Sequence, residues 1–392
     1  YCDSKRHKTD IFTATHRQTA RDIAAETFVL LKNDRQLLPL SKQGKIALIG
    51  PMADTRSNMS GTWSVAATPD RYSSLRESME KALEGKATLL YAQGCNVVYD
   101  EQEQKDGELG KTIARGDDAQ MEAEALEVAR QADVIVCAMG ETADMSGECA
   151  SRTDLRMPDA QRHLLAQLAR TGKPIVLLNF SGRPTVLTWE QEHLPAIMNV
   201  WFGGSEAADA ICDVIFGDKV PCGKLTASMP KTTGQEPLYY NHQNTGRPVP
   251  DDNPRFAKFA SNYLDVRNGA LYPFGYGLSY TTFEYGPLQI SADHTATVRV
   301  TNTGSRATDE SVQLYISDQV ASLSRPWKEL KAFRRISLKN GESTKVEFDI
   351  TPEMLQCWGV SEKWSVEPGD FTILLGSSSS DSDLTPLPLK VK

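Results

Sequence analysis

Continuously apolar runs alternate with amphipathic segments along the first 230 residues of the chain. The apolar runs have the length of strands and are predicted as strands buried on both faces: 45–50, 87–94, 133–140, 174–180, 195–202 and 223–230. The intervening segments repeat apolar positions at helical spacing and are predicted as helices: 16–31, 73–85, 119–132, 158–171 and 205–217. This alternation predicts an α/β sandwich domain with a mostly parallel sheet covered on both faces.

The last hundred or so residues follow a different pattern, in which apolar and polar positions alternate one by one. Examples are "TATVRVTNTG", "ESVQLYISD" and "GDFTILLG", and turn signals separate them. This pattern predicts an all-β sandwich of the immunoglobulin or fibronectin type III-like class. The polar stretch 377–383 lies between two strand-like runs and is predicted as the tip of a hairpin.

These changes in pattern divide the chain into four predicted parts. An N-terminal linker covers 1–15 and the α/β sandwich domain covers 16–230. A connector rich in Gly, Pro, Asn and aromatic residues covers 231–285, and the β-sandwich covers 286–392. A loop-rich connector of this length is usually functional or packed, so we expect it to be structured.

Composition and charge exclude several classes of partner. The chain of 392 residues has a net charge of −8 and no cluster of Lys and Arg, so we expect no nucleic-acid partner. No apolar run reaches the roughly 20 residues of a membrane span, so we expect no membrane partner. The seven cysteines form no C-x-x-C pair and the six histidines no H-x-H pair, so we expect no metal site. Cys137 and Cys212 are predicted as buried thiols, and a chain that starts at Tyr1 is expected to be a piece of a longer protein or a processed product.

The sequence "GETADMSGECASR", residues 140–152, follows directly on the third predicted strand. In parallel sheets, ligands bind where the carboxyl ends of the strands release their loops. A carboxylic acid such as Glu141 or Glu148 on this glycine-flanked loop is therefore a candidate general acid/base. The alternative is a solvated loop, in which Glu148 and Asp154 pair with Arg152 or Arg156.

Glycoside hydrolysis needs a second carboxylate, roughly 5 Å from the first when the configuration is retained. No obvious partner carboxylate occurs elsewhere in the chain. The chain also has no G-x-S-x-G element of a serine esterase and no phosphate-binding loop.

Several segments, in order along nearly the whole chain, resemble the C-terminal half of glycoside hydrolase family 3 enzymes, and especially periplasmic bacterial β-glucosidases. They include "ETFVLLKNDRQLLPL", "GETADMSGECASRTDLRMPDAQRHLL", "GKPIVLLNFSGRP", "NTGRP" and "LYPFGYGLSYTTFEY". The resemblance implies a retaining, exo-acting β-glucosidase that acts on β-glucosides or oligosaccharides in the periplasm or outside the cell. It also implies an N-terminal β/α barrel, absent from this sequence, that carries the nucleophilic Asp.

In such an enzyme the acid/base lies on the loop that matches residues 141–152. The resemblance favours Glu148 in this role, with Glu141 as the alternative or as a brace that holds the loop by hydrogen bonds. Ser151 and Arg152 are predicted to orient Glu148 or to contact substrate, and Arg152 could equally form a structural ion pair. Two carboxylates account for every proton transfer and for the covalent intermediate in this chemistry, so we expect no cofactor, and we expect the chain alone to be inactive.

Other interpretations stay open at this point. The chain could be a non-catalytic carbohydrate-binding or interaction protein, or part of a β-xylosidase, and a homodimer is a further expected partner. Asn244 and Arg247 have no assigned role beyond proximity to the cleft, and packing of the connector is favoured. Trp63 and Trp201 could stack on sugars, but filling the core or a domain interface is favoured for both.

Overall fold

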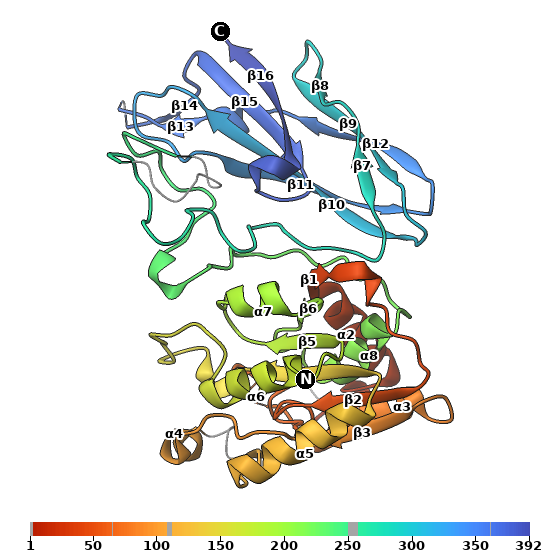
Figure 1. The fold of residues 1–392 in the computed structure, drawn as a ribbon. Coiled ribbons are helices and arrows are strands. Elements are labelled where there is room, and N and C mark those ends of the chain that lie inside the picture. The colour runs from red at the N-terminus through yellow and green to blue at the C-terminus, as the bar shows by residue number, and fades with distance from the viewer. Residues whose placement is uncertain (1–2, 65, 108–111, 250–257, 361) are drawn as a thin grey trace. The chain divides into compact units, whose positions relative to one another are not determined.

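The computed structural model describes residues 3–64, 66–107, 112–249, 258–360 and 362–392. The chain divides into two compact units, Tyr1–Gly223 and Lys224–Lys392, shown in Figure 1 in red to green and in green to blue. The predicted combination of an α/β domain with an antiparallel β-sandwich is confirmed. The boundaries between the four predicted parts stay predictions.

The first unit is built on a six-stranded sheet in the order β1-β6-β5-β4-β2-β3. Its strands are β1 (Val29–Asn33), β2 (Lys45–Ile49), β3 (Thr88–Ala92), β4 (Val134–Gly140), β5 (Ile175–Phe180) and β6 (Ala196–Asn199). All neighbouring strands run parallel except β1, which pairs antiparallel with β6. Every residue of β5 is buried, which explains why its sequence is apolar except at Asn179.

Two groups of helices pack against this sheet (Figure 1). One group comprises α5 (Asp118–Gln131) and α6 (Asp159–Ala169), and the other α2 (Ala14–Thr27), α3 (Leu75–Leu83) and α8 (Ala207–Ile215). The short helices α1 (His7–Asp10), α4 (Glu101–Asp106) and α7 (Thr188–His193) complete the unit. Local sequence sets the helix starts: Ser74 and Glu77, for example, form a capping box at the start of α3.

Two predictions for helices and strands were wrong, one in this unit and one at the start of the second unit. The helix expected over 16–31 ends at Thr27, because the apolar run that follows pairs as the edge strand β1. The strand expected over 223–230 is an irregular segment that forms a single bridge, between Met229 and Tyr272. Leu225 and Met229 are buried, so these apolar side chains fill space in the core although their backbone does not form a strand ladder.

The second unit is a sandwich of two antiparallel sheets. One sheet has the order β11-β10-β15-β16 and the other β12-β9-β7, with β8 also paired to β9. The strands are β7 (Phe283–Tyr285), β8 (Gln289–Ile290), β9 (Thr295–Asn302), β10 (Thr308–Asp318), β11 (Glu329–Leu338), β12 (Ser343–Asp349), β15 (Gly369–Gly376) and β16 (Leu384–Val391). Helix α9 (Pro352–Leu355) and a small hairpin of β13 (Cys357–Trp358) and β14 (Trp364–Ser365) follow β12.

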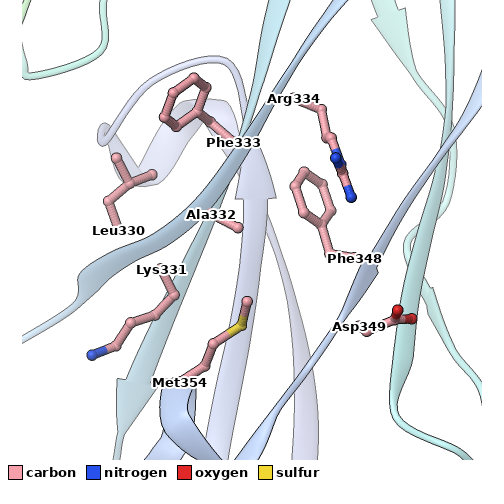
Figure 2. Close-up of a pocket in the computed structure, with 8 residues that line it drawn as sticks. All are labelled: Leu330, Lys331, Ala332, Phe333, Arg334, Phe348, Asp349 and Met354. Atoms are coloured by element: carbon pink, nitrogen blue, oxygen red, sulfur yellow. The ribbon is translucent and has the colours of Figure 1, made fainter.

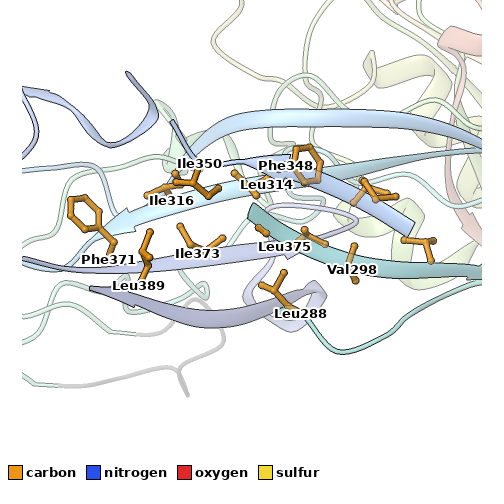
Figure 3. Packing of buried hydrophobic residues seen from close by; sticks show 14 of the residues in the cluster. Leu288, Val298, Leu314, Ile316, Phe348, Ile350, Phe371, Ile373, Leu375 and Leu389 are labelled. Carbon is orange, nitrogen blue, oxygen red and sulfur yellow. The ribbon is translucent and has the colours of Figure 1, made fainter. Parts of the chain in front are cut away.

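Apolar side chains from both sheets meet in the core of this sandwich (Figure 3). Val298 comes from one sheet, and Leu314 and Ile373 from the other. Alternate residues of β9 are buried, as the one-by-one alternation of its sequence requires. The segment 377–383 joins the paired strands β15 and β16, so the predicted hairpin tip is confirmed.

Candidate active site at the ends of β4 and β5

The acidic loop, residues 140–152, leaves the sheet at the carboxyl end of β4. We divide it into a loop root (140–145) and a loop tip (146–150). Gly140 is the last residue of β4 and pairs with Phe180, the last residue of β5, so the segments after both strands start side by side. The predicted position of this loop, at the edge of the sheet where parallel α/β domains bind ligands, is confirmed.

The start of the loop root is held in one conformation. Gly140 has φ +136°, and a Cβ there would lie 2.0 Å from the carbonyl oxygen of Phe180. The amide group of Gln161, on α6, accepts from Gly140 N at 2.8 Å and donates to Gly140 O at 2.9 Å. Further on, Ala143 N donates to the buried side chain of Asn58 at 2.9 Å. The backbone therefore has a fixed direction where it leaves the sheet.

Glu141 is a buried carboxylate, with only 2% of its side chain exposed. Its Oε1 lies 3.2 Å from Arg152 Nη1 and 3.2 Å from Arg183 Nε. Ser181 Oγ lies 3.1 Å from its Oε2. A buried charge is tolerated when ion pairs and hydrogen bonds replace its hydration, and Glu141 has both. The side chain thus braces the loop root.

Arg183 is a residue that sequence analysis missed. It follows β5 in the segment "NFSGRP", and its Nη2 donates to the carbonyl oxygens of Met145 and Ala150, the latter at 2.6 Å. The neighbouring Gly182 leaves room for the loop, because a Cβ there would lie 2.2 Å from Ser146 Oγ. The signal available in the sequence was the position of this segment: it follows the next strand along the chain after β4, and parallel neighbours release their loops at the same edge.

Glu148 has the opposite environment. It lies exposed in the loop tip, and none of the residues that the structure describes gives it a hydrogen bond or an ion pair. Gly147, with φ +103°, precedes it. Ser151 is also exposed, and Arg152 is directed to Glu141. The structure therefore brings together Glu141, Arg152 and Arg183 but makes no ion pair between Arg152 and Glu148.

The expected ion pair at the end of the loop forms between Asp154 and Arg156, whose carboxylate and guanidinium are 2.6 Å apart. The hydrogen bonds from Arg156 lower the pKa of Asp154 to about 2. The solvated-loop interpretation is thus correct for Asp154, but it does not describe Glu148.

The two tryptophans differ from each other. Trp63 is 69% exposed and does not fill the core, so the core half of the favoured prediction was wrong and a place in a domain interface stays a prediction. Its Nε1 would lie 3.5 Å from a Cβ placed on Gly147, which puts it beside the loop tip. Trp201 is partly buried, and its Nε1 donates to the carbonyl oxygen of Thr27 at 3.1 Å, which is a packing role.

The two pockets described in the second unit are less suited to acid/base chemistry than the acidic loop. A shallow pocket of about 470 Å³ lies on β11 and β12, where Phe333 and Arg334 point away from each other and Asp349 lies at the margin (Figure 2). A larger pocket of about 640 Å³ is lined by connector residues together with Trp327 and Asp381. Asp381 is the one carboxylate among the described residues lining that pocket, and it is paired with Lys328.

Asn244 and Arg247 of the "NTGRP" segment also belong to the second unit. Both Asn244 and Arg247 are exposed, and Arg247 donates to the carbonyl oxygen of Phe259 at 3.2 Å. This hydrogen bond stays within the irregular segment that precedes β7. It fits the packing role favoured from the sequence.

Within the described parts of the chain, no three His, Cys, Asp or Glu side chains are grouped to hold a metal ion. No helix in the described parts of the chain has the length and apolar character needed to cross a membrane. Cys137 and Cys212 are buried, as predicted, and burial raises the pKa of both thiols. Among the three carboxylates of the acidic loop, that of Glu148 is exposed, that of Asp144 is partly buried and that of Glu141 is buried.

Comparison with models of known protein families identifies the class of protein to which this chain belongs. A model of the glycosyl hydrolase family 3 C-terminal domain matches residues 28–280, and a model of the fibronectin type III-like domain matches residues 310–379. Both units thus correspond to the C-terminal part of a glycoside hydrolase. The chain belongs to glycoside hydrolase family 3, as the resemblance implied.

Relatives with assigned names agree with this class. The chain is 42% identical over 375 residues to a periplasmic β-glucosidase of Salmonella typhimurium, covering 93% of this chain and 49% of that protein. It is 36% identical over 394 residues to a β-xylosidase of Formosa agariphila, covering 97% of this chain and 51% of that protein. A solved β-glucosidase of Listeria innocua in complex with glucose gives a TM-score of 0.85 at 33% identity, covering 97% of this chain and 50% of that one. The chain spans about half the length of the curated relatives it matches.

Proposed function

We propose that this chain is the C-terminal half of a retaining, exo-acting β-glucosidase, and that Glu148 is its general acid/base. One observation carries the assignment: of the two candidate glutamates, Glu148 is exposed on the loop tip while Glu141 is buried in ion pairs. A proton donor must reach the substrate, and the side chain of Glu141 is buried and paired with two arginines. The relatives named β-glucosidase support the substrate class.

The proposed reaction has two steps. Glu148 first protonates the glycosidic oxygen of the leaving group, while an Asp on an N-terminal barrel attacks the anomeric carbon and forms a covalent glycosyl-enzyme. Glu148, now a carboxylate, then takes a proton from water, which attacks the anomeric carbon and releases the sugar and the Asp. No cofactor takes part in this scheme. Ser151 and Arg152, which follow the loop tip, are proposed substrate contacts.

The cellular location is part of the same proposal. A relative named periplasmic β-glucosidase supports a periplasmic or secreted enzyme. The expected homodimer stays a prediction.

The decisive experiment uses the restored enzyme, by which we mean this chain together with its N-terminal half. The Glu148→Ala variant is expected to lose about 10²–10⁴-fold in kcat on an oligosaccharide, whose leaving group needs protonation. Dinitrophenyl β-glucoside needs no acid to depart, so its glycosylation step persists and azide restores turnover by replacing the missing base-activated water. Glu84→Ala, at an exposed glutamate after α3, is the matched control and keeps full activity.

Three results would overturn parts of the proposal. Azide rescue in Glu141→Ala, with none in Glu148→Ala, would transfer the role to the buried glutamate. Absence of turnover in the restored enzyme, with retained sugar binding, would favour a non-catalytic carbohydrate-binding protein. Higher kcat/KM on xylosides than on glucosides would favour a β-xylosidase, the alternative that the Formosa relative supports.

A further inference from the structure

One guanidinium group joins the loop root, the loop tip and the neighbouring strand end. Arg183 Nε lies 3.2 and 3.3 Å from the two carboxylate oxygens of Glu141. Its Nη2 donates to the carbonyl oxygens of Met145 and Ala150. These two carbonyls flank residues 146–149, the segment that contains Glu148. A single side chain therefore closes the base of the loop tip.

We propose that Arg183 is a positioning residue for the acid/base, which fixes where the loop tip presents the Glu148 carboxyl. The inference rests on the proposed function of Glu148, and it goes beyond it by naming the group that controls its position. Glu148 receives no hydrogen bond from the described residues, so its location depends on the backbone that carries it. Arg183 holds that backbone at both ends.

The surroundings of Arg183 make it rigid. Its side chain is only 19% exposed, and its backbone N donates to Ser181 Oγ at 3.1 Å. Glu141, with 2% of its side chain exposed, supplies the buried negative charge that allows a guanidinium to be buried here. The charge pair thus fixes the direction of the guanidinium, and the terminal nitrogen fixes the loop.

An arginine is needed for this geometry. Its planar guanidinium presents several N–H groups in a fixed fork, so it can bind a carboxylate through Nε and two carbonyls through Nη2 at once. A lysine keeps the charge but carries its three N–H donors on one nitrogen, so it cannot place donors at the positions of both Nε and Nη2. Arg183→Lys therefore separates the charge from the positioning. Arg152, which also pairs with Glu141, makes no contact with the carbonyl of Ala150 in the described structure.

The test measures how strongly catalysis by the restored enzyme depends on the leaving group. For an oligosaccharide, kcat of Arg183→Lys is expected to fall by about tenfold to a hundredfold, with KM within about twofold, because a displaced acid weakens protonation and not binding. For dinitrophenyl β-glucoside, kcat/KM is expected to stay within about threefold of the starting enzyme, because that leaving group needs no proton. A loss of folded protein would lower the activity on both substrates equally.

Two control variants separate the positioning role of Arg183 from the acid/base role of Glu148. Arg156→Lys makes the same chemical change at an arginine that pairs with Asp154, and it is expected to keep the starting leaving-group dependence. Glu148→Ala tests the underlying function: if it shows no leaving-group dependence and no azide rescue, the assignment of Glu148 fails. If Glu148→Ala behaves as expected while Arg183→Lys loses activity equally on both substrates, or loses none, only the positioning role of Arg183 is overturned.

A second variant covers the case in which Arg183→Lys does not fold. The double variant Glu141→Gln, Arg183→Met removes both buried charges together, so it leaves neither partner of this pair as an uncompensated ion. It also lacks the bonds to Met145 and Ala150. It is expected to show the same selective loss on the oligosaccharide, and faster hydrogen exchange at residues 146–150. Unchanged exchange and unchanged leaving-group dependence in this variant would overturn the proposal.

Discussion

The loop root and the loop tip carry the same acidic residue in opposite environments. In the root, Glu141 is buried between Arg152 and Arg183. In the tip, Glu148 is exposed and has no ion-pair partner among the described residues. The root resembles a site in the β-sandwich, where the buried Glu310 lies 3.3 Å from Lys224 Nζ and accepts from the hydroxyl of Tyr285 at 2.8 Å. A buried, fully paired glutamate is thus a structural device in both units.

This comparison separates two requirements that a catalytic loop must meet. The backbone must be held still, which favours buried charges and saturated hydrogen bonds. The reacting group must reach its substrate and exchange protons, which favours exposure and freedom from strong ion pairs. Residues 140–152 meet both by dividing the tasks between two glutamates close in sequence.

The largest expected difference between root and tip is in stability. Glu141→Ala leaves two partly buried arginines without their counter-ion and is expected to cost about 3–5 kcal/mol of unfolding free energy. Glu148→Ala removes an exposed side chain and is expected to change that free energy by no more than about 0.5 kcal/mol. Urea unfolding, followed by hydrogen exchange at residues 135–140 of β4, measures both in the first unit.

Glu141→Gln is the control for this pair, because it keeps the shape of the side chain while removing the charge. It should fall between the two alanine variants. Equal unfolding free energies for Glu141→Ala and Glu148→Ala would contradict the division of the loop into a structural root and an exposed tip.

A smaller difference in stability is expected between variants of two glycines of the loop, Gly140 in the root and Gly147 in the tip. Alanine at Gly140 would meet the carbonyl oxygen of Phe180, a backbone atom of the sheet, at 2.0 Å, and is expected to cost at least about 2–3 kcal/mol. Alanine at Gly147 would meet the methyl group of Thr62 at 2.4 Å, and a side chain on a loop can yield. The positive φ of Gly147 alone is expected to cost about 1–2 kcal/mol.

Thermal unfolding of both variants checks this order. Gly172→Ala is the control, because its φ is +71° and a Cβ there would meet nothing within 4 Å. It measures the cost of the backbone conformation alone. If Gly140→Ala is no more destabilised than Gly172→Ala, the loop root is not held as rigidly as its contacts indicate.

The regular parts of the fold could be predicted because buried apolar positions recur along the sequence with the period of the helix or strand. The run at 174–180 is apolar except at Asn179 and forms the fully buried β5, and residues 295–302 alternate and form the half-buried β9. The prediction of a strand from an apolar run failed at 223–230, where Leu225 and Met229 are buried but the backbone pairs at one bridge. Periodicity also failed at Phe28–Leu31, because an apolar run beside a helix does not show whether the helix continues.

For the candidate site, the sequence located the loop but not its supports. Strand order brings Arg183 next to Glu141, although the two are far apart in the sequence, and no local pattern records such a contact. The exposure of Glu148 and the burial of Glu141 were likewise invisible, because both are glutamates in a polar, glycine-containing segment. The partner of Arg152 could be decided only by the fold.

The smallest predicted effect concerns the ion pair just beyond the loop, and it depends on pH. Hydrogen bonds from Arg156 hold the pKa of Asp154 at about 2, below its usual 3.8. Since folding lowers this pKa, the stabilisation is fully present above the unfolded value and is lost as the pH falls through about 2. Both side chains are substantially exposed, so solvent screening limits the contribution to about 1 kcal/mol or less.

Asp154→Asn is therefore expected to lower the unfolding midpoint slightly at about pH 6 and not at about pH 2. Asp70→Asn, at a side chain that is 97% exposed, is the control. A difference that grew as the pH was lowered would have the wrong sign for a carboxylate stabilised by an arginine, and the Asp154–Arg156 pair would then contribute nothing to the stability of this segment.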